Sequence, residues 1–91
     1  MNKQMFKEII NSGIDKFTTS FVVLEKNGES KVRTFSEEFE EENEFYGGIQ
    51  ELKKDGWVVM FCGCEEDVYT ARCVTEFEED IDEVFNRIYG E

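Results

Sequence analysis

The dipeptide Asn27-Gly28 constrains the fold of this 91-residue chain more than any other short segment. Asn-Gly is a preferred pair for a two-residue hairpin turn, because both turn positions need a positive φ. The flanking residues suit strands: Phe17 to Glu25 is rich in Thr, Val and Phe, and Lys31 to Phe35 follows the turn. The sequence therefore predicts an antiparallel hairpin here.

Two helices are expected around this hairpin. Residues 2–11 carry apolar side chains four positions apart, which predicts a short helix before the first strand. After the hairpin, Phe45, Ile49 and Leu52 repeat with helical spacing. The pair Gly47-Gly48 inside this second helix predicts either a late helix start or a close approach of another group, because each Gly costs about 1 kcal/mol relative to Ala.

A second hairpin is predicted towards the C-terminus. Trp57 to Cys62 is a continuous apolar run, and Val68 to Thr75 has strand-forming residues. The residues between them, including Glu65 to Asp67, are expected to form an acidic loop. Thr75 and Glu78 then match the T-x-x-E capping box and predict the start of a last helix that runs to about Tyr89.

The resulting order is α-β-β-α-β-β-α. It predicts a single α+β domain over residues 1–91, with a four-stranded antiparallel sheet. The helices are expected mainly on one face of the sheet, so that the other face is exposed to solvent. The aromatic residues are assigned to the core, apart from the surface candidates Tyr46, Tyr69 and Tyr89. The assigned core residues are Phe6, Phe17, Phe21, Phe35, Phe45, Trp57, Phe61, Phe77 and Phe85.

Negative charge is concentrated in the second half of the chain. Residues 1–34 carry six Lys or Arg and four Asp or Glu, whereas residues 35–91 carry four and eighteen, for an overall net charge of −12. Six acids fall within Glu37–Glu44, six within Glu76–Glu83, and three more are consecutive at 65–67. Such a surface repels nucleic acid and acidic membranes and attracts proteins that bind polyanions.

Catalysis and metal binding are not expected. The chain has no His and three Cys, too few ligands for a typical four-ligand zinc site, and the acids beside Cys62 and Cys64 disfavour a reactive thiolate. All three thiols, including Cys73, are predicted to be buried or half-buried. An odd Cys count and the lack of a signal peptide or membrane span predict a cytoplasmic protein.

Carboxylate and phosphate chemistry are disfavoured as well. The acids lie in runs where they stay solvated, so none is expected to have the raised pKa that acid–base catalysis needs. Asp80 and Asp82 begin like a calcium loop, but Val84 stands at the third ligand position. No phosphate-binding glycine motif is present, and the cations are scattered. We expect no cofactor, no direct nucleic-acid binding and no enzyme activity.

The acidic runs themselves are the predicted binding site. If residues 76–83 form a helix, six acids over roughly 12 Å give about one charge per 2 Å, close to the ~1.7 Å spacing of duplex DNA. A tyrosine among the acids would supply a desolvated anchor, because rim charges alone add little affinity. The predicted partner-binding residues are Glu37, Glu38, Glu40, Glu41, Glu42, Glu44, Tyr46, Glu65, Glu66, Asp67, Tyr69, Glu76, Glu78, Glu79, Asp80, Asp82 and Glu83.

In size, acidity and element pattern, with the runs 37–44 and 76–83, the chain resembles the small phage-encoded inhibitors of bacterial defence, which include anti-CRISPR proteins and DNA mimics. The resemblance implies a non-enzymatic protein that occludes the nucleic-acid or PAM-reading site of a host effector such as a CRISPR-Cas nuclease. Two alternatives stay open: an immunity or antitoxin-type partner of a basic toxin, and a housekeeping accessory domain that forms a homodimer.

Overall fold

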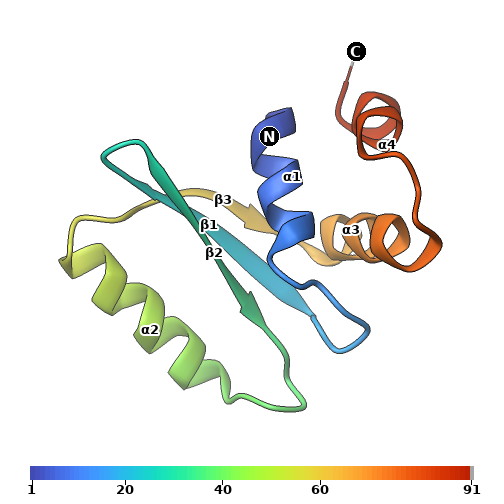
Figure 1. Cartoon of the computed structure of the whole chain (residues 1–91). Coiled ribbons are helices and arrows are strands. Elements are labelled where there is room, and N and C mark those ends of the chain that lie inside the picture. Colours follow the sequence, from blue (N-terminus) through green and yellow to red (C-terminus); the bar gives the residue numbers. More distant parts are fainter. Residues whose placement is uncertain (91) are drawn as a thin grey trace.

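A computed structural model describes residues 1–90. The elements are α1 (Lys3–Asn11), β1 (Ser20–Lys26), β2 (Glu29–Phe35), α2 (Glu42–Lys54), β3 (Val58–Gly63), α3 (Glu65–Phe77) and α4 (Ile81–Ile88) (Figure 1). The fold is a small α+β domain with four helices and one antiparallel sheet of three strands in the order β2-β1-β3.

The predicted first hairpin is confirmed. β1 and β2 pair from Ser20 opposite Phe35 to Lys26 opposite Glu29, so Asn27-Gly28 forms the two-residue turn. Both turn residues have positive φ, 51° and 81°, as this type of turn requires. The strand starts later than predicted, because Asp15 accepts a hydrogen bond from the Phe17 N–H and organises a turn over residues 15–18.

The predicted second hairpin is wrong. Val68 to Thr75 is not a strand but the interior of α3, and Glu65 to Asp67 is the first turn of that helix, not a loop. The sheet consequently has three strands where four were predicted, and the element order is α-β-β-α-β-α-α. Val68, Ala71 and Val74 are the buried residues of α3, and their spacing of three puts them on one helical face.

The last helix also begins later than predicted. Thr75 lies inside α3, so the T-x-x-E match does not mark a helix start. Asp80 is the actual N-cap of α4, and its side chain accepts a hydrogen bond from the Glu83 N–H at 2.9 Å. The predicted end near Tyr89 is confirmed, since Tyr89 is the C-cap of α4.

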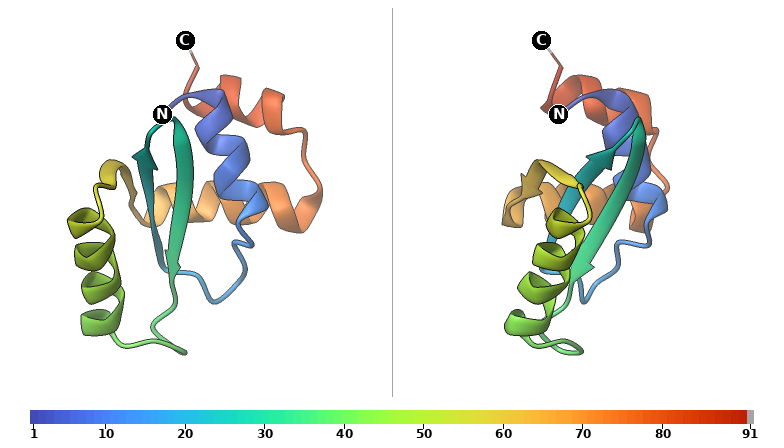
Figure 2. Two further views of the ribbon diagram at one scale, coloured as in Figure 1. Left: turned by 60° about the vertical axis from the view of Figure 1, so that its left-hand side comes forward. Right: turned by 90° about the vertical axis from the view of Figure 1, so that its left-hand side faces the viewer.

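Helices cover both faces of the sheet, which contradicts the prediction that one face is exposed to solvent. One core contains Val22 and Leu24 of β1 with Phe45 and Ile49 of α2. The other face of β1 packs Phe21 and Val23 against α1 and α3. Figure 2 shows α2 on one side of the sheet and the other three helices on the opposite side. Because β1 is central and covered on both faces, all four residues from Phe21 to Leu24 are buried.

A third cluster attaches α4 to the domain. Phe6 of α1, Val74 of α3 and Val84 of α4 are buried together, with Phe85 and Tyr89 packed against them. The rings of Phe6 and Phe85 lie 5.8 Å apart, and those of Phe6 and Tyr89 lie 5.5 Å apart. Hence α4 packs against α1 and α3.

Candidate protein-binding surface

Acidic residues occupy the first turn of three of the four helices. Glu42 and Glu44 lie in the first turn of α2, Glu65 to Asp67 in that of α3, and Asp82 and Glu83 in that of α4. Carboxylates at a helix N-terminus interact with the positive end of the helix dipole, worth about 0.3–1 kcal/mol each. Much of the acidic pattern therefore helps to specify where these helices begin.

Two acidic groups that are distant in sequence meet at one cleft. Glu37, which follows β2, and Glu65, which opens α3, both line a hollow of about 430 Å³. Tyr69 and Arg72 of α3 border the same hollow, together with Thr18 and Thr19. The acidic groups at residues 37–44 and 65–67 thus meet on one surface, with the exposed Tyr69 beside them.

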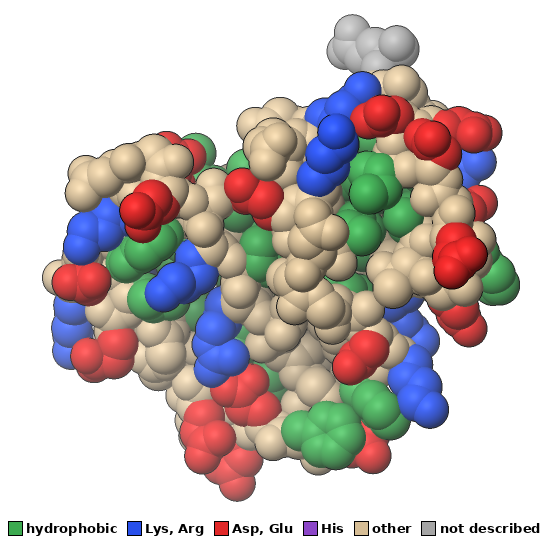
Figure 3. Space-filling view, viewed as in Figure 1, with side chains coloured by type: hydrophobic (Ala, Val, Ile, Leu, Met, Phe, Trp, Pro, Cys, Tyr) green, Lys and Arg blue, Asp and Glu red, His purple; other side chains and the backbone are tan. Residues whose placement is uncertain are grey.

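The acidic run Glu76–Glu83 lies at the other end of α3. It spans the last turn of α3, the turn with Glu78 in the left-handed conformation, and the first turn of α4. It is not one helix, so the charge spacing predicted for a helical run does not apply. Figure 3 shows acidic side chains over the loop before α2 and separately over α4, with Lys and Arg between them.

Four of the predicted acids are engaged within the fold. Glu40 pairs with Arg33, and Asp82 pairs with Lys3 and Lys7 at 3.6 and 3.8 Å. Asp80 caps α4, and Asp67 is hydrogen-bonded as described below. The remaining predicted acids are exposed and form no ion pair with another residue of the described range 1–90: Glu37, Glu38, Glu41, Glu42, Glu44, Glu65, Glu66, Glu76, Glu78, Glu79 and Glu83.

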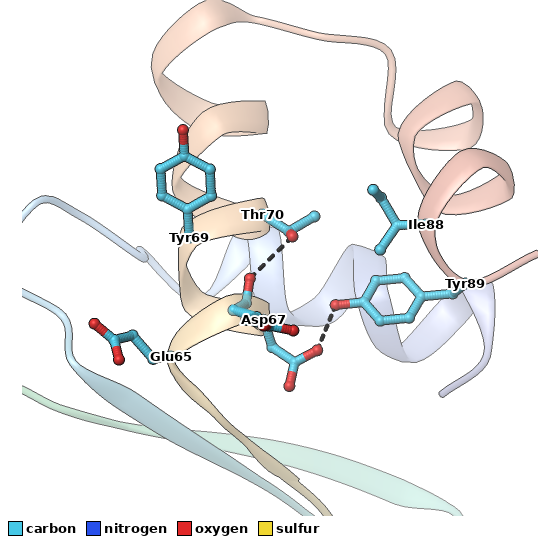
Figure 4. Close-up of a pocket in the computed structure, with 7 residues that line it drawn as sticks. Glu65, Asp67, Tyr69, Thr70, Ile88 and Tyr89 are labelled. Carbon is cyan, nitrogen blue, oxygen red and sulfur yellow. Dashed lines mark hydrogen bonds between the residues drawn. The ribbon is translucent and has the colours of Figure 1, made fainter.

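Asp67 joins α3 to α4. Its Oδ1 accepts a hydrogen bond of 2.6 Å from the Tyr89 hydroxyl (Figure 4). Its Oδ2 accepts from the Cys64 N–H at 3.0 Å and from the Cys64 thiol at 3.1 Å. Burial opposes ionisation of Asp67, but these three donors outweigh it, so its pKa lies below the ordinary value. Burial and the bond to Asp67 both raise the pKa of Tyr89.

The two tyrosines predicted as anchors are both exposed. The exposed fraction is 68% for Tyr69 and 55% for Tyr46. Each lies one helical turn beyond an exposed glutamate, Glu65 on α3 and Glu42 on α2. Tyr89, the third surface candidate, is half-buried and held by Asp67. The placement thus keeps Tyr69 and Tyr46 available to a partner.

Two apolar surface residues were missed by the sequence prediction. Phe77, assigned to the core, is 67% exposed, and Ile88 of α4 is 50% exposed. Phe77 follows Tyr69 and Cys73 at intervals of four residues, so all three lie along one side of α3. The four-residue spacing of Tyr69, Cys73 and Phe77 could have indicated one shared helical face. Because residues 68–75 were predicted as a strand, this spacing was not interpreted as helical.

The cysteines are more accessible than predicted. Cys62 and Cys64 are exposed and only Cys73 is half-buried, which contradicts the expectation of three buried or half-buried thiols. Cys62 is exposed because β3 is an edge strand, and Cys64 because it stands at the start of α3. Within residues 1–90, no group of three or more Cys, Asp or Glu is placed to hold a metal ion.

The comparisons add no relative from which a function could be transferred. No protein-family model, no curated protein and no solved structure matches this chain. None of the helices within residues 1–90 has the length and apolarity that a membrane crossing needs. The class defined by fold and surface is therefore an acidic α+β domain with an acid-lined cleft beside an exposed aromatic helix face.

Proposed function

We propose that this protein is a non-enzymatic inhibitor that occupies the nucleic-acid or PAM-binding groove of a host defence effector, such as a CRISPR-Cas nuclease, by charge mimicry. The observation that carries the proposal is the cleft shared by Glu37 and Glu65, where two separate acidic groups meet beside Tyr69. Lys and Arg side chains that normally hold phosphates would face these carboxylates instead.

In this proposal, the acidic groups at residues 37–44 and 65–67 supply most of the carboxylates that replace phosphates. The exposed glutamates near this cleft include Glu37, Glu38, Glu65 and Glu66. Their charge would accelerate encounter with a basic groove and make binding sensitive to salt. Tyr69 would add the desolvated contact that exposed charges lack. An immunity-type partner of a basic toxin would use the same surface.

A homodimeric accessory domain is the second candidate, favoured by one specific feature. Within residues 1–90, β3 is an edge strand that pairs only with β1, and its Val58 and Met60 are 60% and 50% exposed. Edge strands with exposed apolar residues can pair with a second chain. Met60 is also the extra residue of a bulge, because Val23 pairs with Phe61 and Leu24 with Val59. A bulge at an edge works against such pairing.

The test compares two triple variants that lose the same charge. Glu37, Glu65 and Glu66 are changed to Gln in the cleft variant, and Glu25, Glu29 and Glu51 in the control. Each protein is titrated into DNA-cleavage assays with a panel of purified CRISPR-Cas nucleases. We expect the wild type to inhibit at least one nuclease, the cleft variant to require about tenfold more protein, and the control to change less than about twofold.

The same assay includes competition by substrate DNA added before the protein. Charge mimicry predicts that pre-bound DNA and added salt both weaken inhibition. Equal losses for the two triple variants, or no inhibition of any nuclease in the panel, would contradict the proposal. A homodimer that persists in 0.5 M NaCl by light scattering, without inhibition, would support the accessory-domain alternative.

A further inference from the structure

A groove runs between α3 and α4 along the exposed side of the domain. Two adjoining hollows, of about 590 and 280 Å³, share Tyr69, Thr70 and Ile88 among their lining residues. Cys73 and Phe77 continue the α3 wall, and Arg87 with Ile88 forms the α4 wall. The groove follows the length of α3, about 20 Å for its 13 residues.

The walls of the groove carry large apolar side chains exposed to solvent. Tyr69, Phe77 and Ile88 are 68%, 67% and 50% exposed, and each lines one or both hollows. Exposed apolar residues that gather at a hollow, and are bordered by polar ones, mark interaction sites more often than scattered ones do. The surface thus offers apolar contacts as well as charge.

The groove is held in shape by contacts beneath it. The Tyr89 hydroxyl donates to Asp67, which ties the C-terminal end of α4 to the first turn of α3. Val74 of α3 and Val84 of α4 are both buried against Phe6. A partner would therefore meet a preformed site and would not have to order it, which lowers the cost of binding.

Carboxylates stand at both ends of the groove. Glu65, Glu66 and Asp67 line one end and Glu79 lines the other, while Arg87 is the one cation among the lining residues of the two hollows. A second copy of this chain would bring a net charge of −12 against an equal charge. The charge around the groove favours a basic occupant over a second copy.

We propose that this groove binds an amphipathic helix of a basic partner, whose apolar side chains contact Tyr69, Phe77 and Ile88 and whose flanking Lys or Arg residues face the glutamates at both ends. An occupant of about 13 helical residues matches this length of about 20 Å. The inference rests on the proposed function in one respect, that the partner is a basic protein, and it adds the chemistry by which that partner is held.

The test uses a fluorescein-labelled peptide of about 14 residues, with Leu at helical spacing in the middle and two Lys at each end. A scrambled peptide of the same composition keeps the charge but loses the apolar face. Binding is followed by fluorescence anisotropy in 50 mM NaCl. We expect the amphipathic peptide to bind at least about tenfold more tightly than the scrambled one.

Two double variants then locate the site. Tyr69→Ser with Phe77→Ser is expected to weaken peptide binding about tenfold, whereas Val58→Ser with Met60→Ser, which removes two exposed apolar residues elsewhere, should change it less than about twofold. Far-UV circular dichroism verifies that both remain folded. A second measurement follows alkylation of Cys73 in a Cys62→Ser, Cys64→Ser background, where bound peptide should slow the reaction at the groove.

Equal binding of the scrambled peptide, unchanged binding by the Tyr69, Phe77 variant, or unprotected Cys73 would overturn the groove proposal. These results differ from those that would remove the proposed function. If the glutamate variant loses nuclease inhibition while the Tyr69, Phe77 variant inhibits normally, the proposal of charge mimicry is supported and the proposal of a helix-binding groove is contradicted. If the peptide binds in the groove but the protein inhibits no nuclease, the helix-binding groove is supported and the proposed inhibitor function is contradicted.

Discussion

At the scale of single residues, Asp67 illustrates how one carboxylate in an acidic run can differ from its neighbours. Glu65 and Glu66 point to solvent, whereas Asp67 accepts hydrogen bonds from Tyr89 and Cys64. A carboxylate that accepts several hydrogen bonds is stabilised in its charged form. The same acidic run therefore combines residues available to a partner with one that fixes the arrangement of α3 and α4.

Replacing Tyr89 with Phe tests this structural role. We expect the free energy of unfolding at pH 7 to fall by about 1 kcal/mol, because Asp67 loses a hydrogen-bond donor in a half-buried place. Urea denaturation followed by circular dichroism measures the change. Tyr46→Phe is the control, because no hydrogen bond of its hydroxyl is found in residues 1–90, and it should leave the urea midpoint unchanged.

The pH dependence of the same variant has a defined sign. The lowered pKa of folded Asp67 adds stability above the ordinary carboxyl pKa near 4, and this is lost as the pH falls through the folded pKa. The raised pKa of folded Tyr89 adds stability below the ordinary value near 10, lost as the pH rises beyond it. In a plot of the urea midpoint against pH, Tyr89→Phe should therefore show a smaller fall than the wild type at both the acidic and the alkaline end. Parallel curves for the variant and the wild type would contradict this prediction.

At the scale of secondary structure, α3 was the element that the sequence pattern misassigned. Its Val, Thr and Tyr residues favour strands, and its N-cap is Cys64 in place of the usual Ser, Thr, Asp or Asn. Its C-terminal turn places Glu78, not Gly, in the left-handed conformation, at φ 51°. Neither end of α3 thus carries its usual capping residue, and the packing of Val68, Ala71 and Val74 stabilises the helix.

The rest of the fold follows from local patterns. The hairpin, α1, α2, β3 and the end of α4 are all in the predicted places, because turn chemistry and apolar spacing are local properties. The candidate surface depends on how distant segments meet. Glu37 and Glu65 share a cleft only because α3 packs across β1, and a run-by-run prediction could name both residues but not their proximity.

The glycine pair in α2 leads to a stability prediction. The helix begins at Glu42, so the predicted late start is wrong. A methyl group placed at Gly48 would meet the Arg33 side chain at ordinary contact distance. Apart from the neighbouring residues and backbone of α2 itself, no atom of residues 1–90 lies within 4 Å of a methyl group placed at Gly47. Gly47→Ala should therefore raise the free energy of unfolding by about 0.5–1 kcal/mol, measured by urea denaturation. A decrease would mean that α2 is not a regular helix at this position.

The end of α3 gives a second prediction at this scale. A residue other than Gly or Asn in the left-handed conformation costs about 1 kcal/mol, and Glu78 is such a residue. We expect Glu78→Gly to raise the thermal midpoint, because relief of this strain exceeds the greater flexibility of Gly when unfolded. Glu79→Gly, one position later, is the control and should lower it. The opposite order would contradict the assigned end of α3.

At the scale of the whole molecule, the net charge of −12 opposes the compact state. Five ion pairs are formed within residues 1–90, far fewer than the acids they would have to neutralise. We expect the urea midpoint to rise between 10 mM and 500 mM NaCl, because salt screens this repulsion. The matched measurement in sucrose separates screening from general stabilisation, and no rise with NaCl would contradict the prediction.

The central position of β1 has a consequence for folding during protein synthesis. Its first neighbour, β2, follows directly in sequence, but its second neighbour, β3, comes after the whole of α2. Until residues 58–63 have also left the ribosome, a hairpin that has already formed has one edge of its most apolar strand open to other chains. Synthesis of β3 closes that edge, so the interval between the two pairings is when this chain is most exposed to misassembly.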